Sequence, residues 1–166
     1  MLIPENTTIT VNADNVTVKG KAATLEKKFS PRVLKVAVEN NEVTVNPIGK
    51  KTRRVAAMQG AFESHLRNMI KGSNESYEKK LTLVYAHFPV SVEVKGELIQ
   101  IKNFLGEKTP RTAKIKGKTK VVVKGQEITV TGNDKEDVGQ TCSNIIKATR
   151  ITKRDVRVFQ DGIYYA

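Results

Sequence analysis

The sequence contains an internal duplication, which restricts the fold more than any other feature of the chain. Three segments of alternating apolar and polar residues recur in the same order, at offsets of 81, 83 and 85 residues: 9–11 with 90–92, 16–18 with 99–101, and 43–45 with 128–130. Such alternation has the two-residue period of a half-buried strand, and a stretch with helical spacing closes each copy. The duplication therefore predicts an α+β fold of two tandem similar domains, each an antiparallel β-sheet packed with one α-helix.

Each expected helix carries its own start or stop signal. Apolar residues recur every three to four positions over 51–71, and Gly72 is the expected end of that helix. The second helix is expected to start near Asn133 and Asp134, where an N-cap residue and an acidic first turn favour a helix. Its apolar face includes Cys142, which we expect to behave as a small buried hydrophobic residue.

The two copies meet at a short polar segment. Residues 72–76 have the small, polar composition of a linker. After them, residues 80–89 are expected to form the opening strand of the second copy. These features predict an N-terminal repeat domain over 1–77 and a C-terminal repeat domain over 78–166.

Positive charge is spread along the whole chain. The 166 residues include 29 Lys and Arg against 17 Asp and Glu, which gives a net charge of +12. The parts before and after residue 74 carry +6 each, so a disordered basic tail is not the source of the charge. A charge of this size indicates a polyanionic partner, and nucleic acid is the polyanion that fits.

The sequence argues against several other classes of protein. The single cysteine permits no internal disulfide and no multi-cysteine zinc site, which favours a cytoplasmic location. No apolar run approaches the roughly 18 residues of a membrane-spanning helix. His65 and His87 each stand without a partner at ligand spacing, and the Gly-Lys-Thr of 117–119 lacks the earlier glycine of a phosphate-binding loop. We therefore expect no catalytic residue, metal, cofactor, membrane or small-molecule substrate.

A basic stripe runs through residues 102–124, whose only acidic member is Glu107. In an extended chain, alternate residues over 114–120 would project from one face, and bound phosphates would relieve the repulsion between their ammonium groups. The alternative is that these lysines protect an exposed sheet edge from aggregation. The basic members of the stripe are Lys102, Lys108, Arg111, Lys114, Lys116, Lys118, Lys120 and Lys124.

A second basic cluster precedes an aromatic C-terminal segment that includes Tyr164. Its arginines could hold an RNA backbone while phenol rings stack on bases or riboses. For Phe159 and Ile163 we favour the alternative, in which both pack on the second core. Because aromatic residues make up only 5% of the chain, backbone and shape recognition should dominate over base stacking. The cluster consists of Arg150, Lys153, Arg154 and Arg157.

Four separated motifs resemble one known family. They are residues 68–72 (Asn-Met-Ile-Lys-Gly), 84–89 (Val-Tyr-Ala-His-Phe-Pro), 103–108 (Asn-Phe-Leu-Gly-Glu-Lys) and 161–164 (Asp-Gly-Ile-Tyr). The chain resembles the universal large-subunit ribosomal protein six family in its archaeal and eukaryotic form, called ribosomal protein nine in eukaryotes. The resemblance covers nearly the whole chain in order, with a matching duplication.

The resemblance implies a ribonucleoprotein role in the large ribosomal subunit, close to the sarcin-ricin loop and the landing site of translational GTPases. It implies that the second domain makes most of the contacts with large-subunit rRNA, and that neighbouring ribosomal proteins and translational GTPases are further partners. The family usually has two arginines after the 103–108 loop, and this chain has Pro110 and Arg111 there. The residues expected to bind rRNA are Lys102, Asn103, Gly106, Lys108, Arg111, Lys114, Lys116, Lys118, Lys120, Lys153, Arg154, Arg157 and Tyr164.

Physical chemistry gives the residues of the 103–108 loop different expected roles. Gly106 would let the chain turn and let backbone N–H groups approach phosphates. Phe104 and Leu105 would anchor the loop to the sheet. Glu107 is unusual beside phosphates and would pair with Lys108 or another cation to set its direction.

We consider three functions. The first is a structural component that binds rRNA and braces the factor-binding region of the large subunit. The second is a free-standing basic module that binds nucleic acid outside the ribosome. The third, an enzyme acting on RNA, would have to use His65 and His87 and is the least favoured.

Overall fold

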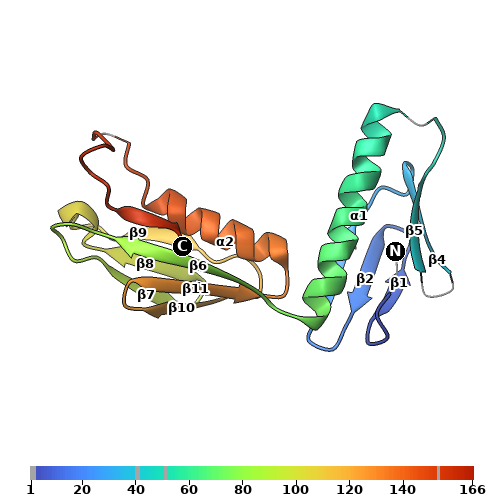
Figure 1. The fold of residues 1–166 in the computed structure, drawn as a ribbon, viewed down its shortest axis with the longest axis horizontal. Helices are drawn as coiled ribbons and strands as arrows, with labels where there is room; N and C mark the ends of the chain where they lie inside the picture. The colour runs from blue at the N-terminus through green and yellow to red at the C-terminus, as the bar shows by residue number, and fades with distance from the viewer. Residues whose placement is uncertain (1–2, 40–41, 51, 153) are drawn as a thin grey trace. The chain divides into compact units, whose positions relative to one another are not determined.

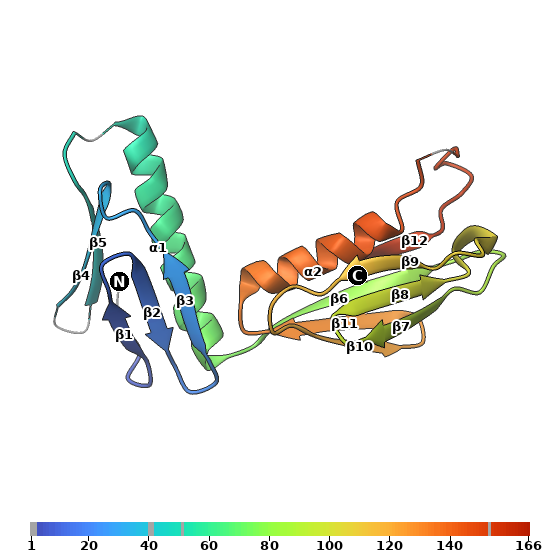
Figure 2. The same ribbon diagram turned by 180° about the vertical axis from the view of Figure 1, so that it is seen from behind.

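The computed structural model describes residues 3–39, 42–50, 52–152 and 154–166, and the chain divides into two compact units, Met1–Ser76 and Tyr77–Ala166 (Figures 1 and 2). Each unit combines antiparallel sheets with one helix, which confirms the predicted α+β class. Each unit holds two small sheets where one was expected.

In the first unit, a three-stranded meander and a two-stranded hairpin enclose a core with one helix. Alternate residues of β2 and β5 are buried, as the sequence period predicts, and they pack with Phe62 and Leu66 of α1. The side chain of Thr52 caps the helix by accepting a hydrogen bond from the Val55 N–H at 3.3 Å. The elements are β1 (Thr8–Val11), β2 (Asn15–Lys19), β3 (Thr24–Lys28), β4 (Leu34–Glu39), β5 (Glu42–Pro47) and α1 (Arg53–Asn74).

In the second unit, a three-stranded sheet ordered β7-β8-β9 and a four-stranded sheet ordered β10-β11-β6-β12 share one core with helix α2. Figure 2 shows β9 and β12 alongside this helix, and α2 contacts β6, β9, β11 and β12. The elements are β6 (Tyr77–Val84), β7 (Ser91–Lys95), β8 (Leu98–Lys102), the 3-10 turn η1 (Phe104–Gly106), β9 (Arg111–Lys114), β10 (Lys120–Lys124), β11 (Glu127–Gly132), α2 (Lys135–Ala148) and β12 (Gly162–Tyr165).

The repeated segments occupy equivalent places in the two units. The matched pairs fall on or beside β1 and β7, on β2 and β8, and on β5 and β11. The second unit adds β6 and β12, which pair with each other in the four-stranded sheet. Its opening strand begins earlier than expected and ends at Val84, so residues 85–89 of the predicted strand lie outside it.

The predicted end of the first helix at Gly72 is wrong, because α1 continues to Asn74 and the supposed linker is partly helical. Gly72 and Ser73 are buried. The turn between β2 and β3 packs onto this last helical turn, where the N–H groups of Ala22 and Ala23 donate to the Ser73 carbonyl at 2.8 and 3.2 Å. Tertiary contacts therefore extend the helix past the glycine.

The second helix begins as predicted. The Asp134 carboxylate accepts a hydrogen bond from the Glu136 N–H at 2.8 Å and caps the helix. Cys142 is fully buried, which confirms its expected place in the core, and burial raises the pKa of its thiol. Within the described part of the chain, neither helix is long and apolar enough to cross a bilayer.

The close approach between Gly20 and Ser73 gives a stability test. A Cβ atom at position 20 would lie 2.6 Å from the Ser73 carbonyl oxygen, too close for either backbone to stay in place. We expect Gly20→Ala to lower the free energy of unfolding by about 1–3 kcal/mol, measured by urea denaturation. Gly60→Ala is the matched control, because nothing lies within 4 Å of its added methyl. That change should raise helix propensity and stabilise the protein by up to about 1 kcal/mol; equal effects of the two substitutions would contradict the packing described.

Candidate nucleic-acid interface

The loop over residues 103–108 connects β8 to β9 and is tightly wound. Asn103, Leu105 and Gly106 have φ values of 59°, 52° and 75°, in the left-handed region. The Asn103 side chain donates to the Pro89 carbonyl at 3.0 Å, and a Cβ atom on Gly106 would lie 3.3 Å from the Phe88 ring. The loop is therefore held in one conformation by contacts on both sides.

Phe104 and Leu105 anchor the loop, as expected. The expectation that backbone N–H groups near Gly106 are available to phosphates is not confirmed. Phe104 is buried with 1% of its surface exposed, and Leu105 packs against the same core. The N–H groups of Gly106 and Glu107 donate to carbonyls of the loop itself, at 3.4 and 3.0 Å. These two N–H groups close the turn and are therefore already used within the loop.

The side chain of Arg111 turns back onto the protein. Its guanidinium donates to both carboxylate oxygens of Glu107, at 2.6 and 2.8 Å, and to the Ala148 carbonyl at the end of α2 at 2.9 Å. It also donates to the Arg150 carbonyl at 3.2 Å and lies over the Phe104 ring, 4.5 Å from the centroid. Most of its donors are thereby used, which makes Arg111 a residue that positions the loop.

The Glu107–Arg111 ion pair confirms that Glu107 serves to orient a cation, and it shifts the pKa of both side chains. The hydrogen bond from Arg111 lowers the pKa of the Glu107 carboxyl, partly opposed by burial, and the charge of Arg154 lowers it further. The same hydrogen bond raises the pKa of Arg111. Arg154 is therefore close enough to the loop to act on its carboxylate.

Lys102 is also engaged within the protein. Its ammonium group lies 2.6 Å from the Glu93 carboxylate of the neighbouring strand, and Lys95 lies 3.9 Å from the same residue. The hydrogen bond from Lys102 lowers the pKa of Glu93. Lys102 is predicted to bind rRNA, and in this structure it takes part in an ion pair across β7 and β8.

Residues 114–120 are not extended throughout, so the condition under which the four lysines would share one face of a strand is not met. β9 ends at Lys114, the chain turns through Gly117 with a φ of 60°, and β10 begins at Lys120. The four lysines of this segment, Lys114, Lys116, Lys118 and Lys120, are nonetheless all exposed. They border a turn between two sheets, and we call residues 114–120 the lysine turn.

Helix α2 holds the lysine turn through polar residues that the sequence did not single out for this role. The Thr141 hydroxyl accepts a hydrogen bond from the Lys116 N–H at 3.0 Å, and the Asn144 amide donates to the Lys114 carbonyl at 2.9 Å. The Asp137 carboxylate lies against Gly117, where it occupies the space that a Cβ atom would need. Asp137, Thr141 and Asn144 are spaced by four and three residues, which places them on one face of the helix. This spacing is the sequence signal that could have identified them.

The C-terminal segment places its residues in different settings. The Arg154 guanidinium lies over the Phe159 ring, 4.9 Å from the centroid, and Arg157 is exposed. Ile163 is buried in the core, as expected, whereas Phe159 is only half-buried. Tyr164 in β12 is 49% exposed, and its hydroxyl donates to the Gln160 carbonyl at 3.2 Å. Lys153 is predicted to bind rRNA and lies outside the described residues.

The candidate residues of the second unit thus form two groups along α2. The loop with Arg111 and Arg154, which we call the loop cluster, lies at the end of the helix near Ala148. The lysine turn extends along the same helix from Asp137, which lies against Gly117, to Asn144, which donates to the Lys114 carbonyl. With a rise of about 1.5 Å per residue, the loop cluster is about 16 Å along the helix from the Gly117 end of the lysine turn and about 6 Å from its Lys114 end, and β9 connects the two groups.

The Glu107–Arg111 pair predicts a pH-dependent contribution to stability. The folded-state pKa of Glu107 lies below its ordinary value of 4.5, so the stabilisation is present above that pH and is lost as the pH falls through the lowered pKa. We expect Glu107→Gln to cost about 0.5–1 kcal/mol at neutral pH, allowing for solvent screening, and much less at about pH 3, as measured by urea denaturation. Glu97→Gln, on an exposed turn, is the control and should have little effect at either pH. A cost of Glu107→Gln that does not change with pH would contradict the ion pair.

Comparison with known proteins is consistent with the sequence motifs. The family model described as "Ribosomal protein L6" matches residues 3–75 and again residues 88–162. A "Large ribosomal subunit protein uL6" of Methanosarcina mazei is 48% identical over 98% of this chain and 92% of its own length. Proteins of the same name from Methanobrevibacter smithii and Methanococcus vannielii are 47% and 46% identical over 98% of this chain, and 90% and 88% of theirs. With two tandem matches and three such relatives, the chain belongs to the ribosomal protein L6 family, uL6, as the motifs indicate.

Proposed function

We propose that this chain is a non-enzymatic structural component of the large ribosomal subunit that binds rRNA through its second unit. The names of the relatives and the tandem match to the family support a place in the large subunit. The net charge of +12 supports a nucleic-acid partner. The rRNA contact lies near the sarcin-ricin loop and braces the region where translation factors bind. Neighbouring ribosomal proteins and translational GTPases are its other partners in the cytoplasm.

One observation carries this proposal: two basic groups are held on one rigid helix. Phosphate contacts fix the orientation of a protein on RNA, and folded RNA is recognised by its shape. Two groups that together span about 16 Å of one scaffold can discriminate between arrangements of phosphates, whereas a flexible arm cannot. The second unit therefore selects a folded rRNA surface by geometry in addition to charge.

The candidate residues divide into ligands and positioning residues. The exposed cations make the phosphate contacts: Lys108, Lys114, Lys116, Lys118, Lys120, Arg154 and Arg157. Lys153, which lies outside the described residues, is assigned to the same contacts from the sequence alone. Arg111 and Lys102 are held by carboxylates and set the shape of the surface. Asn103 and Gly106 give the loop its conformation, and Tyr164 offers half of its surface to a ribose or base.

Charge reversal in the lysine turn tests the proposal. A triple variant with Lys114→Glu, Lys116→Glu and Lys118→Glu should fold normally, because all three side chains are exposed, but should be lost from large subunits by at least about tenfold. Sedimentation through sucrose gradients at physiological salt, with detection of the tagged protein, measures this. The control is Lys19→Glu, Lys21→Glu and Lys35→Glu, which changes the charge equally at exposed positions of the first unit.

The possible outcomes are distinct. Normal incorporation of the lysine-turn variant would contradict the assigned interface. Equal loss of both triple variants would show that only net charge matters. A wild-type protein that stays at the top of the gradient would instead support the free-standing nucleic-acid-binding module.

A further inference from the structure

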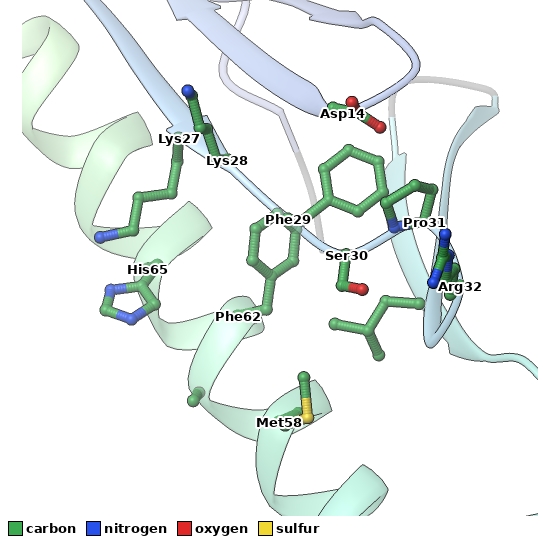
Figure 3. Close-up of a pocket in the computed structure, with 12 residues that line it drawn as sticks. Asp14, Lys27, Lys28, Phe29, Ser30, Pro31, Arg32, Met58, Phe62 and His65 are labelled. Carbon is green, nitrogen blue, oxygen red and sulfur yellow. The ribbon is translucent and has the colours of Figure 1, made fainter.

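The first unit contains a cavity that the proposed rRNA interface does not use. It has a volume of about 710 Å³ and lies between α1 and the segment that follows β3. Figure 3 shows the rings of Phe29 and Phe62 at its centre, with Met58 beside them on the helix. This cavity lies within one compact unit, so its shape depends on that unit alone.

The floor of the cavity is apolar and adaptable. The rings of Phe29 and Phe62 are 5.5 Å apart between centroids and tilted by 44°. Met58 and Ala61 line the same cavity from α1, and Pro31 lines it from the opposite side. A flexible thioether beside two aromatic rings can adjust to aliphatic or aromatic side chains of different shape. The half-buried Phe29 and Met58 border this hollow, and a concave apolar site with polar residues around it is typical of a binding site.

The rim of the cavity is positively charged. Lys28 and Arg32 are exposed at its edge, and Lys27 and His65 also line it. Asp14 is the one acidic residue among those that line it. An apolar floor inside a cationic rim complements a ligand that has an apolar centre flanked by carboxylates.

We propose that this cavity docks an acidic segment of another protein, which inserts an aliphatic or aromatic side chain against Phe29 and Met58 while its carboxylates meet Lys28 and Arg32. This interaction is independent of rRNA binding by the second unit. It gives the first unit, which carries +5 of the net charge of +12, a function of its own.

The same features favour a protein segment over RNA. Stacking of a base requires an accessible flat aromatic face. Here Phe62 is 6% exposed, Phe29 is half-buried and the two rings are tilted against each other, so neither presents an open platform. An inserted side chain needs only a concave apolar site, and the cavity provides one.

The test uses the full chain and a short fluorescent peptide that carries a Leu-Phe pair flanked on both sides by glutamates. Fluorescence anisotropy at physiological salt measures its binding, and three competitors are compared: the same peptide with Ser-Ser in place of Leu-Phe, a lysine-flanked Leu-Phe peptide, and oligouridylate. Ala61→Glu places a carboxylate in the cavity from an exposed helical position. Ala56→Glu is the matched control, because Ala56 is exposed on the same helix about 140° around its axis.

We expect saturable binding of the acidic Leu-Phe peptide, weakened at least about tenfold by Ala61→Glu and unchanged by Ala56→Glu. Lys28→Glu combined with Arg32→Glu should weaken it to a similar extent without touching the floor. Circular dichroism and thermal denaturation confirm that each variant folds.

Three results would overturn the proposal. The first is no binding up to about 1 mM peptide, and the second is equal binding when Leu-Phe is replaced by Ser-Ser, which would indicate charge alone. The third is displacement by oligouridylate that Ala61→Glu abolishes, which would assign the cavity to RNA. None of these results bears on rRNA binding by the lysine turn, so the two proposals can fail separately.

Discussion

The hydrogen bonds between helix α2 and the backbone of residues 114–116 are the interaction on which the second unit depends. The Lys116 N–H and the Lys114 carbonyl lie where β9 ends and the chain turns toward the other sheet. Thr141 and Asn144 supply hydrogen-bond partners to both groups from the helix. Because both hydrogen bonds reach the backbone, they fix the path of the chain at this turn. The basic turn is thereby part of the folded core structure and does not behave as an independent loop.

Rigidity matters because closely spaced cations repel one another. A flexible segment would spread its lysines apart, and ordering it on RNA would cost conformational entropy. In this chain the cost is met during folding, when Gly117 adopts its left-handed conformation against Asp137. At the other end of α2, the Glu107–Arg111 pair does the same for the loop cluster. The Glu107 carboxylate within this basic surface therefore orients a cation. It removes one unit of positive charge from the surface, and in return the loop has a defined shape.

Much of the fold could be predicted because the alternating strands repeat. The valines of β2 and the isoleucines of β8 have the same period and the same buried face, so one half of the sequence supports the assignment of the other. What could not be predicted depends on contacts distant in sequence. Gly72 reads as a helix end, yet Ser73 stays helical because the β2–β3 turn docks onto it. β12 pairs with β6, from which most of the sequence of the second unit separates it, and no local sequence pattern predicts this pairing.

The candidate site shows the same division. The basic stripe and the loop motif are visible in the sequence, and so is the need of Glu107 for a cationic partner, but the choice of Arg111 over Lys108 is not. The hydrogen bonds of Arg111 to the Ala148 and Arg150 carbonyls join residues 37 and 39 positions apart and could not be predicted from the sequence. The alternation of lysines over the lysine turn predicts a strand only if Gly117 is disregarded. A glycine between two lysines was the local evidence for a turn, and it outweighed the alternation.

Native-state hydrogen exchange of the Lys116 amide in the free protein tests the central claim most directly. If α2 holds the lysine turn before any RNA is bound, this exposed residue should have a protected amide, because its N–H donates to Thr141. Thr141→Val, which removes the hydroxyl and keeps the shape, should abolish that protection while the amides of the α2 interior remain slow. Exchange of the wild-type Lys116 amide at the rate of an unstructured chain would contradict the account.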